Sequence, residues 1–254
     1  MSTKEMAARD SFGSKTAFVP VPQPAVQGIF EGRSKRFLVS CRIQEKSQII
    51  HSNNTGSMLG LTKKGMPVLA SYSANPKRKL PYTQEAVYLG SQDHGFWVGV
   101  NTSVPNRMLA QAHACGCLPA EKGYVSLRRE IVRNASRLDG LLEGEGLPRL
   151  WVECKNVTLV EDDIAIFPDA VSQRAVKHLH ELTDIVLSGE RAAMFYLVQR
   201  PDARCFGPAD CIDPDYAAAF WEAVDKGVEI WAYHAIVTPQ GVTLAERLPL
   251  ACRP

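Results

Sequence analysis

The 254-residue sequence predicts an α+β protein of two domains, a small β-barrel followed by a mixed α/β domain. Residues 25–90 contain short strand-like runs separated by turn signals, with no long helical pattern. Residues 91–254 instead alternate between helical and strand-like patterns. The charge changes as well, because residues 1–110 carry 14 Lys and Arg against 6 Asp and Glu, whereas residues 111–254 carry 15 against 21. A basic first domain beside an acidic second domain suggests that the first binds a polyanion.

The first domain is predicted to be an OB-like β-barrel. Its strand-like segments are rich in β-branched and aromatic residues, and turn signals at Asn54–Gly56 and Lys63–Gly65 separate them. The expected strands are Phe37–Ile43, Gln48–His51 and Pro67–Tyr72. An OB-fold binds single strands through a basic groove and aromatic stacking.

The second domain is predicted to have a restriction-endonuclease-like α/β core, because one helix precedes three strands, and a helix and a strand follow them. The expected helices cover residues 106–115, 175–187 and 216–225. The expected strands cover residues 125–132, 138–142, 150–160, 192–198 and 228–237.

Residues 1–24 are predicted to form a flexible extension, because Pro20, Pro22 and Pro24 oppose regular structure; an ordered docking strand is the alternative. The first ten residues lack a signal-peptide core, and no apolar run approaches the roughly 18 residues of a membrane span. We therefore expect a cytoplasmic protein that does not associate with membranes. The seven cysteines are expected to be reduced, and Cys115 and Cys117 have the wrong spacing for a zinc site.

A candidate site lies on two of the predicted strands. Glu153 and Lys155 are two residues apart on one strand, so they share a face, roughly 6.6 Å apart along it. The loop at residues 143–148 carries the Gly and Pro of a hairpin, which could bring Asp139 beside them. Two carboxylates suit Mg²⁺ or Mn²⁺, with water and a phosphate completing the shell of the ion. The lysine would orient the attacking water or neutralise the negative charge of the phosphorane. An acid followed by Glu-X-Lys is the arrangement of PD-(D/E)XK nucleases; a surface salt bridge between strands is the plainer interpretation.

Three further residues near this motif are candidates with alternatives. Glu130 is a catalytic candidate that could bind a second metal or hold a water, although an ion pair with Arg128 or Arg133 is an equal alternative. Asp169 follows Pro168 at a helix entrance, where an N-cap or helix-dipole role is expected. His178 is expected to be a capped or core histidine.

Basic side chains supply the candidate nucleic-acid contacts. Two triplets are interleaved with aromatic residues in the barrel, and two more basic residues open the helix at residues 175–187, where a phosphate could bind. Each such side chain is individually more often a solvated surface residue. The candidates are Arg33, Lys35, Arg36, Lys77, Arg78, Lys79, Arg174 and Lys177.

The chain from about residue 27 to residue 250 resembles the sugar fermentation stimulation protein (SfsA) family. The matching segments are Lys35–Leu38, His51–Met58, Asn75–Lys79, Val100–Thr102, Ser136–Asp139, Glu153–Leu159, Phe167–Val171 and Lys177–Leu179. The chain departs from the family where Ser52-Asn53 replaces Cys-Pro, Gly140 replaces Phe, and Cys154 replaces Val. The resemblance implies an OB-like barrel, a nuclease-like domain and DNA binding.

These features together predict a DNA-binding protein with an Mg²⁺-dependent (or Mn²⁺-dependent) nuclease site. The alternative is a non-catalytic DNA-binding regulator of sugar (maltose-type) metabolism genes that retains the nuclease fold as a scaffold. The sequence does not specify the oligomeric state.

Overall fold

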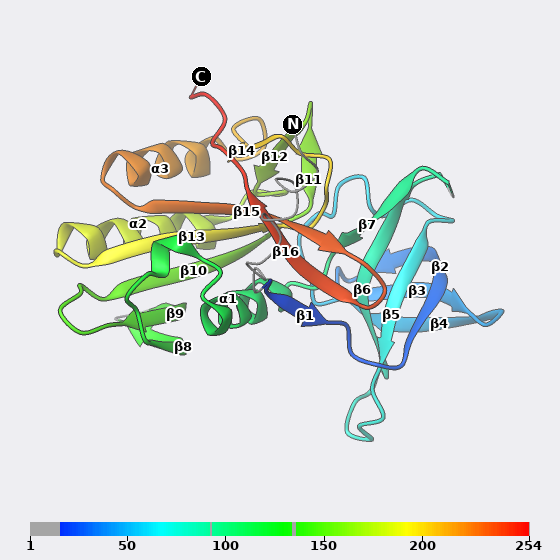
Figure 1. Cartoon of the computed structure of the whole chain (residues 1–254). Coiled ribbons are helices and arrows are strands. Elements are labelled where there is room, and N and C mark those ends of the chain that lie inside the picture. The colour runs from blue at the N-terminus through cyan, green and yellow to red at the C-terminus, as the bar shows by residue number, and fades with distance from the viewer. Residues whose placement is uncertain (1–15, 92, 134–135, 254) are drawn as a thin grey trace, which may run out of the picture.

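The chain folds into two domains that lie side by side, a β-barrel and an α/β domain (Figure 1). The computed structural model describes residues 16–91, 93–133 and 136–253. The order of the domains and their classes are those that the sequence predicts.

The barrel is a six-stranded sheet in the order β4-β3-β2-β5-β6-β7. A parallel pairing of His51 with Thr83 joins β4 to β6 and closes the sheet on itself. Its strands are β2 (Ala25–Ser34), β3 (Leu38–Ile43), β4 (Lys46–His51), β5 (Pro67–Tyr72), β6 (Tyr82–Gly90) and β7 (Gly95–Gly99). Alternate residues such as Phe30, Val39 and Cys41 point inward and are buried. Because β7 belongs to this sheet, the barrel extends past residue 90, where we expected it to end.

The second domain contains a seven-stranded sheet in the order β1-β16-β15-β13-β10-β9-β8. The central pairs β10–β13 and β13–β15 are parallel, and the outer pairs are antiparallel. The strands are β1 (Phe18–Pro20), β8 (Ser126–Arg133), β9 (Ser136–Glu143), β10 (Leu150–Val157), β13 (Arg191–Val198), β15 (Glu229–Val237) and β16 (Gly241–Arg247). The strand expected over residues 150–160 divides into β10 and β11 (Leu159–Glu161), which forms a small separate sheet with β12 (Ile164–Phe167) and β14 (Cys205–Pro208).

Helices cover both faces of the large sheet. On one face, α1 (Val104–Cys115) buries Met108, Leu109 and Ala112, the stripe that the sequence predicts, and η1 (Pro119–Glu121) follows it. On the other face lie α2 (Gln173–Leu187) and α3 (Pro214–Asp225).

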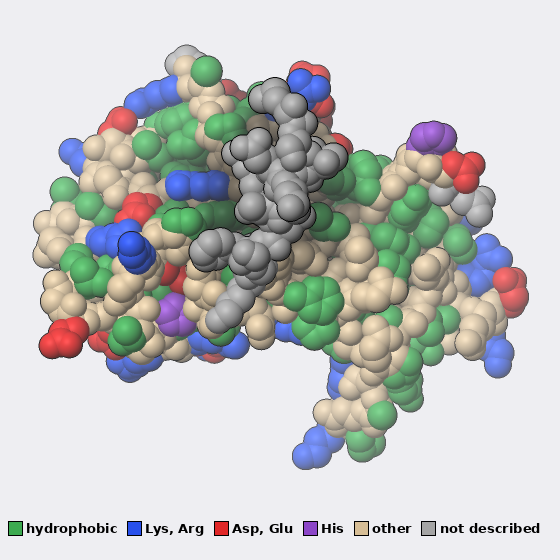
Figure 2. Space-filling view, viewed as in Figure 1, with side chains coloured by type: hydrophobic (Ala, Val, Ile, Leu, Met, Phe, Trp, Pro, Cys, Tyr) green, Lys and Arg blue, Asp and Glu red, His purple; other side chains and the backbone are tan. Residues whose placement is uncertain are grey.

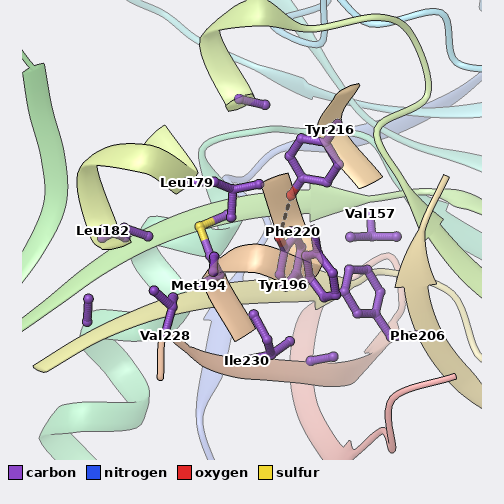
Figure 3. Close-up of a cluster of buried hydrophobic side chains, with 14 of the residues drawn as sticks. Val157, Leu179, Leu182, Met194, Tyr196, Phe206, Tyr216, Phe220, Val228 and Ile230 are labelled. Carbon is purple, nitrogen blue, oxygen red and sulfur yellow. Dashed lines mark hydrogen bonds between the residues drawn. The ribbon is translucent and has the colours of Figure 1, made fainter. Parts of the chain in front are cut away.

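The core beneath α2 and α3 is shown in Figure 3, where Leu179 and Phe220 pack over Met194 and Tyr196 of β13. The Tyr196 hydroxyl is hydrogen-bonded to the Tyr216 hydroxyl in this core. Each fully buried apolar side chain of this kind stabilises the fold by roughly 1.5–3 kcal/mol. Strand β10 therefore lies in a layer packed on both faces, which holds its side chains in place.

One expectation about the edge of the second domain is wrong. The flexible extension expected over residues 1–24 does not hold for residues 18–20, because Phe18–Pro20 pair with β16 as the alternative docking strand. Ala17 and Val19 are buried there. A strand at the edge of a sheet tolerates Pro20, since its missing N–H would face away from the ladder. Residues 1–15 lie outside the described residues.

Cys115 and Cys117 form a disulfide, although we expected reduced thiols. Gly116 ends α1 in a left-handed conformation, with φ of 65°, and the two Cα atoms are 5.4 Å apart, within the range that a disulfide spans. The other five cysteines of the sequence are free. No helix in the described part of the chain is long and apolar enough to cross a membrane.

Candidate functional site

The centre of the candidate site is strand β10. The Glu153 carboxylate lies on the face covered by α2, where its Oε1 accepts a hydrogen bond from Lys155 Nζ at 2.7 Å. The same oxygen is hydrogen-bonded to Nδ1 of His178 from α2. Cys154 points to the opposite face and packs in the cluster beneath α1. The predicted alternation along this strand is therefore present.

Asp139 lies on the neighbouring strand where the β9–β10 ladder stops. The last paired residues are Gly140 and Val152, and one residue further the Asp139 side chain takes the place of a backbone partner. Its Oδ2 accepts a hydrogen bond from the Cys154 N–H at 2.8 Å, and its Oδ1 accepts one from Asn106 Nδ2 of α1 at 2.6 Å. The hairpin thus brings the first acid of the motif against the Glu-X-Lys segment. Helices from both faces of the sheet hold the two acids.

The two carboxylates have different pKa values because their surroundings differ. Burial, and then the charge of Glu153, raise the pKa of Asp139 to about 6, although its hydrogen bonds and Lys155 act in the other direction. Burial also acts to raise the pKa of Glu153, but the charge of Lys155 and the hydrogen bond with His178 outweigh it and leave that pKa below its ordinary value. Glu153 therefore carries the negative charge of the pair most readily.

This pair of acids fits a divalent cation. Glu153 is only 3% exposed, and its Oε2 has no hydrogen-bond partner within the described residues. A buried acceptor without a donor costs free energy that a cation would offset. No group of three or more His, Cys, Asp or Glu side chains suited to a metal occurs in residues 16–91, 93–133 and 136–253. Two carboxylates with solvent completing the shell are what Mg²⁺ commonly accepts, whereas a structural zinc site needs more protein ligands.

A cleft of about 370 Å³ opens over β10, between the two domains. Its floor includes Lys155 and Asn156, one wall is the barrel's Arg36 with the loop at residues 53–56, and the other wall is the segment at residues 166–172. The Lys155 ammonium therefore lies where the motif meets the space between the domains.

The barrel wall of this cleft is held in shape by Arg33. Its guanidinium donates to the carbonyl oxygens of Asn54 at 2.6 Å and Gly56 at 3.0 Å, and its Nε donates to the carbonyl of Arg36 at 2.7 Å. Burial lowers the pKa of Arg33 despite the nearby charge of Asp169. We therefore assign Arg33 to the support of the loop rather than to a phosphate contact.

Asp169 joins the two walls. Its carboxylate accepts a hydrogen bond from the Met58 N–H at 2.8 Å, and its carbonyl accepts one from the Ser57 hydroxyl. The N-cap role expected for Asp169 is wrong, because Ser172 caps α2 by accepting from the Ala175 N–H. Asp169 lies three residues before this N-cap, and its carboxylate is engaged by the barrel instead.

The remaining basic candidates are dispersed. Lys35 and Arg36 form the β2–β3 turn with positive φ, and Arg36 reaches the cleft. Arg174 and Lys177 are exposed at the start of α2. The triplet at residues 77–79 lies on the β5–β6 loop, which protrudes from the barrel (Figure 1), and Lys and Arg side chains mark its end in Figure 2.

Glu130 lies opposite Asp139 in the β8–β9 register, between the pairs Arg129–Gly140 and Ile131–Leu138, but its carboxylate makes an ion pair of its own. It lies on β8 with positive φ, its side chain is 53% exposed, and its carboxylate is 3.5 Å from Arg137 Nη1. The ion pair that we weighed as an alternative is thus present, but with Arg137 instead of Arg128 or Arg133.

The sequence did not indicate two residues of the site: Asn106 was not a candidate, and His178 was expected to be a capped or core histidine. Asn106 orients Asp139 from 33 residues away, and no local pattern indicates this contact. His178 contacts Glu153 from 25 residues away. Its position between Ala175 and Leu182 places it on the buried stripe of α2, and a histidine on such a stripe was the available signal.

Comparison with known proteins gives a consistent result for both domains. Residues 32–100 match the SfsA N-terminal OB domain, and residues 103–241 match the sugar fermentation stimulation protein RE domain. The sugar fermentation stimulation protein homolog of Maridesulfovibrio salexigens is 51% identical over 235 residues, covering 91% of this chain and 97% of that protein. The homolog of Syntrophobacter fumaroxidans is 52% identical over 230 residues, covering 91% and 86%.

A solved structure agrees with these matches. The structure of Pyrococcus furiosus SfsA in complex with Ca²⁺ superposes with a TM-score of 0.84 at 26% identity, covering 92% of this chain and 98% of that chain. The chain therefore belongs to the sugar fermentation stimulation protein (SfsA) family, with an OB domain followed by a restriction-endonuclease-like domain.

Proposed function

We propose that this protein binds nucleic acid, most readily DNA, and hydrolyses phosphodiester bonds with a divalent cation. The observation that carries the proposal is the placement of Asp139, Glu153 and Lys155 on adjacent strands, with Lys155 at the floor of a cleft between two domains. The restriction-endonuclease-like fold of the second domain supports it as an analogy.

Asp139 and Glu153 would hold the cation, Mg²⁺ or Mn²⁺. The unpartnered Oε2 of Glu153 supports this assignment, and so does the Ca²⁺ complex of Pyrococcus furiosus SfsA. When bound, the cation acts as a Lewis acid toward the phosphodiester and lowers the pKa of nearby water.

The residues of the chain have separate tasks around this pair. Asn106 fixes the orientation of Asp139, and His178 fixes that of Glu153. The Lys155 ammonium, with a side chain 14% exposed, offers a positive charge to a phosphate in the cleft. A charge fixed in a largely desolvated place stabilises developing negative charge more strongly than one in water.

Binding of the polymer is assigned mainly to the barrel. Its basic surplus attracts phosphates over a distance, and OB-folds bind nucleic acid with basic and aromatic side chains. Arg36 in the cleft and the protruding residues Lys77, Arg78 and Lys79 are the proposed contacts there. Arg174 and Lys177 would extend the basic surface onto α2.

One observation favours a second candidate, a DNA-binding regulator that does not cleave. Lys155 and His178 already compensate the Glu153 carboxylate, and this is also what a purely structural ion pair would show. The name of the family connects such a regulator with sugar utilisation.

Incubation of the purified protein with labelled DNA and RNA, each single- and double-stranded, separates the two candidates. With Mg²⁺ or Mn²⁺ we expect cleavage, and with EDTA none. The double variant Asp139→Asn, Glu153→Gln should lose both cleavage and calorimetric Mn²⁺ binding while its circular dichroism spectrum is retained.

The control variant Asp184→Asn, Glu222→Gln removes the same charge from exposed positions on α2 and α3 and should behave like the wild type. Binding without any metal-dependent cleavage would leave the regulator as the function. Unchanged Mn²⁺ affinity in the site variant would show that the two acids are structural.

A further inference from the structure

The shape of the cleft restricts what can reach Lys155. Its volume of about 370 Å³ lies near the lower end of the roughly 300–1,000 Å³ of small-molecule sites. Such a space admits one or two nucleotides, whereas the two paired strands of a helix need more room.

The width of the cleft is fixed by hydrogen bonds between its walls. Asp169, in the wall formed by residues 166–172, is hydrogen-bonded to Ser57 and Met58 of the barrel, which forms the other wall. Asn156, on the floor, donates from Nδ2 to the Gly99 carbonyl at 3.3 Å, and the Gly99 N–H donates to the Gln199 carbonyl at 3.0 Å. The residues that make these hydrogen bonds line the cleft or adjoin it. A wider opening would therefore break several of the hydrogen bonds at once.

The charged groups of the site lie deep. The Lys155 side chain is 14% exposed and that of Glu153 only 5%. A phosphate must enter the cleft to approach them, because they do not project toward a ligand outside it. A duplex lying across the rim would leave its phosphates on the outer surface.

The lining of the cleft suits an unpaired nucleotide. Around Lys155 and Arg36 it is lined by the uncharged polar residues Asn53, Thr55, Thr102, Asn156 and Thr158. Asn53, Thr102 and Asn156 already hydrogen-bond within the protein, so the exposed Thr55 is the residue placed to meet a sugar or a base edge.

An aromatic residue lies next in sequence. Phe37 follows Arg36 with 42% of its surface exposed, and its carbonyl accepts from the Ser52 N–H at the start of the loop that forms this wall. Exposed aromatic and Arg side chains together are what stack unpaired bases in OB-fold proteins.

We propose that the cleft accepts single-stranded nucleic acid, with one or two unpaired nucleotides between the domains, and that paired strands are excluded from it. This inference rests on the proposed function and specifies its substrate class. DNA and RNA strands share the phosphates and base edges on which it depends, so both are included in the test.

The test is fluorescence anisotropy of the full-length protein in EDTA, so that no cleavage disturbs the binding. The probes are a short labelled single strand, its blunt duplex and the same duplex with an unpaired tail, at one salt concentration. We expect the single strand and the tailed duplex to bind at least about tenfold more tightly than the blunt duplex, a difference of about 1.4 kcal/mol.

The variant Thr55→Glu places a negative charge at an exposed position of the cleft and should abolish this preference. Ser126→Glu adds the same charge at an exposed position on β8, outside the cleft, and should leave it intact. Thermal unfolding of both variants checks that the fold persists.

The outcomes are distinct for the two proposals. Equal affinity for single strand and blunt duplex, or a preference that survives Thr55→Glu, would overturn the inference while nucleic-acid binding stands. Absence of binding to every probe would overturn both.

Discussion

The Asp169 carboxylate accepts a hydrogen bond from the Met58 N–H, 2.8 Å away, and thereby joins two domains across 111 residues of sequence. Met58 is fully buried, so its N–H has no access to solvent. Gly56 makes the approach feasible, because a Cβ atom there would lie 2.5 Å from Asp169 Oδ1. The wall of the cleft thus depends on one acid in the α/β domain and one glycine in the barrel.

Asp169→Ala should destabilise the protein by roughly 1–3 kcal/mol, because it leaves the buried Met58 N–H without an acceptor. Urea unfolding, followed by circular dichroism, measures the change. Asp169→Asn, which keeps one carbonyl oxygen in place, should cost less. Asp184→Ala, at an exposed position on α2, is the control and should stay within about 0.5 kcal/mol of the wild type. A similarly small effect for Asp169→Ala would show that the contact contributes little.

The central part of the fold was predictable because its signals are local. The run of apolar residues in β10 and the Gly and Pro of the β9–β10 loop specify a hairpin without information from elsewhere. Strand alternation then places Glu153 and Lys155 on one face. Helix α1 was predicted within two residues of its observed start, since Met108, Leu109 and Ala112 already mark its buried stripe.

The parts that were not predicted depend on contacts far apart in sequence. Strand β1 ends in Pro20, with Pro22 and Pro24 after it, and forms because β16 offers an edge on which it can pair. Asp169 was assigned to a helix cap from its position after Pro168, but its partner is in the other domain. His178 and Asn106 belong to the site only because packing brings α2 and α1 onto opposite faces of the same strands. No pattern of neighbouring residues shows such juxtapositions.

The protruding triplet Lys77, Arg78 and Lys79 should dominate the salt dependence of nucleic-acid binding. Each phosphate contact contributes about −0.7 to the slope of log K against log salt for single strands and about −0.9 for duplex. Replacing all three residues with Gln should reduce the magnitude of this slope by up to about 2, as measured by anisotropy titrations at several salt concentrations.

The matched control replaces Lys46, Lys122 and Lys226, three exposed lysines distributed over both domains, with Gln. This variant removes the same net charge as the triplet variant. It therefore separates the effect of direct phosphate contacts from the effect of the total charge of the protein. An identical slope in the triplet variant and the wild type would remove the β5–β6 loop from the binding surface.

Glu121 should make stability depend on pH above neutrality. It is buried at the end of η1, with its Oε2 3.0 Å from Nδ1 of His113, and burial raises its pKa from 4.5 to about 8. The folded state then binds more protons than the unfolded state between these values, so stability falls as pH rises toward 8. Burial lowers the pKa of His113 from its ordinary value of 6.5, so the effect of His113 on stability falls below pH 6.5.

Between pH 6.5 and 8 the Glu121 effect should therefore be separable, with the free energy of unfolding falling by about 1–2 kcal/mol. Urea titrations across this interval measure it. Glu121→Gln, which cannot ionise, should show a flat profile over the same interval. A wild-type profile that is equally flat would contradict the burial of a neutral carboxyl at this position.

Lys155→Ala should affect cleavage far more than binding. The ammonium lies beside Glu153 at the floor of the cleft. In the proposed function, Asp139 and Glu153 hold the cation and the barrel holds the strand. Removal of a single group that stabilises transition-state charge costs roughly two to three powers of ten in rate. Single-turnover cleavage should fall by that amount, whereas calorimetric Mn²⁺ binding and nucleic-acid affinity should change little.

Lys122→Ala, on the surface after η1, provides the control for loss of one positive charge. Loss of Mn²⁺ binding in Lys155→Ala would show that the lysine mainly organises the acids, since its 2.7 Å contact with Glu153 could serve that purpose alone. A rate equal to that of the wild type would place the attacked phosphate elsewhere, because a charge at the floor of the cleft cannot be near it without effect.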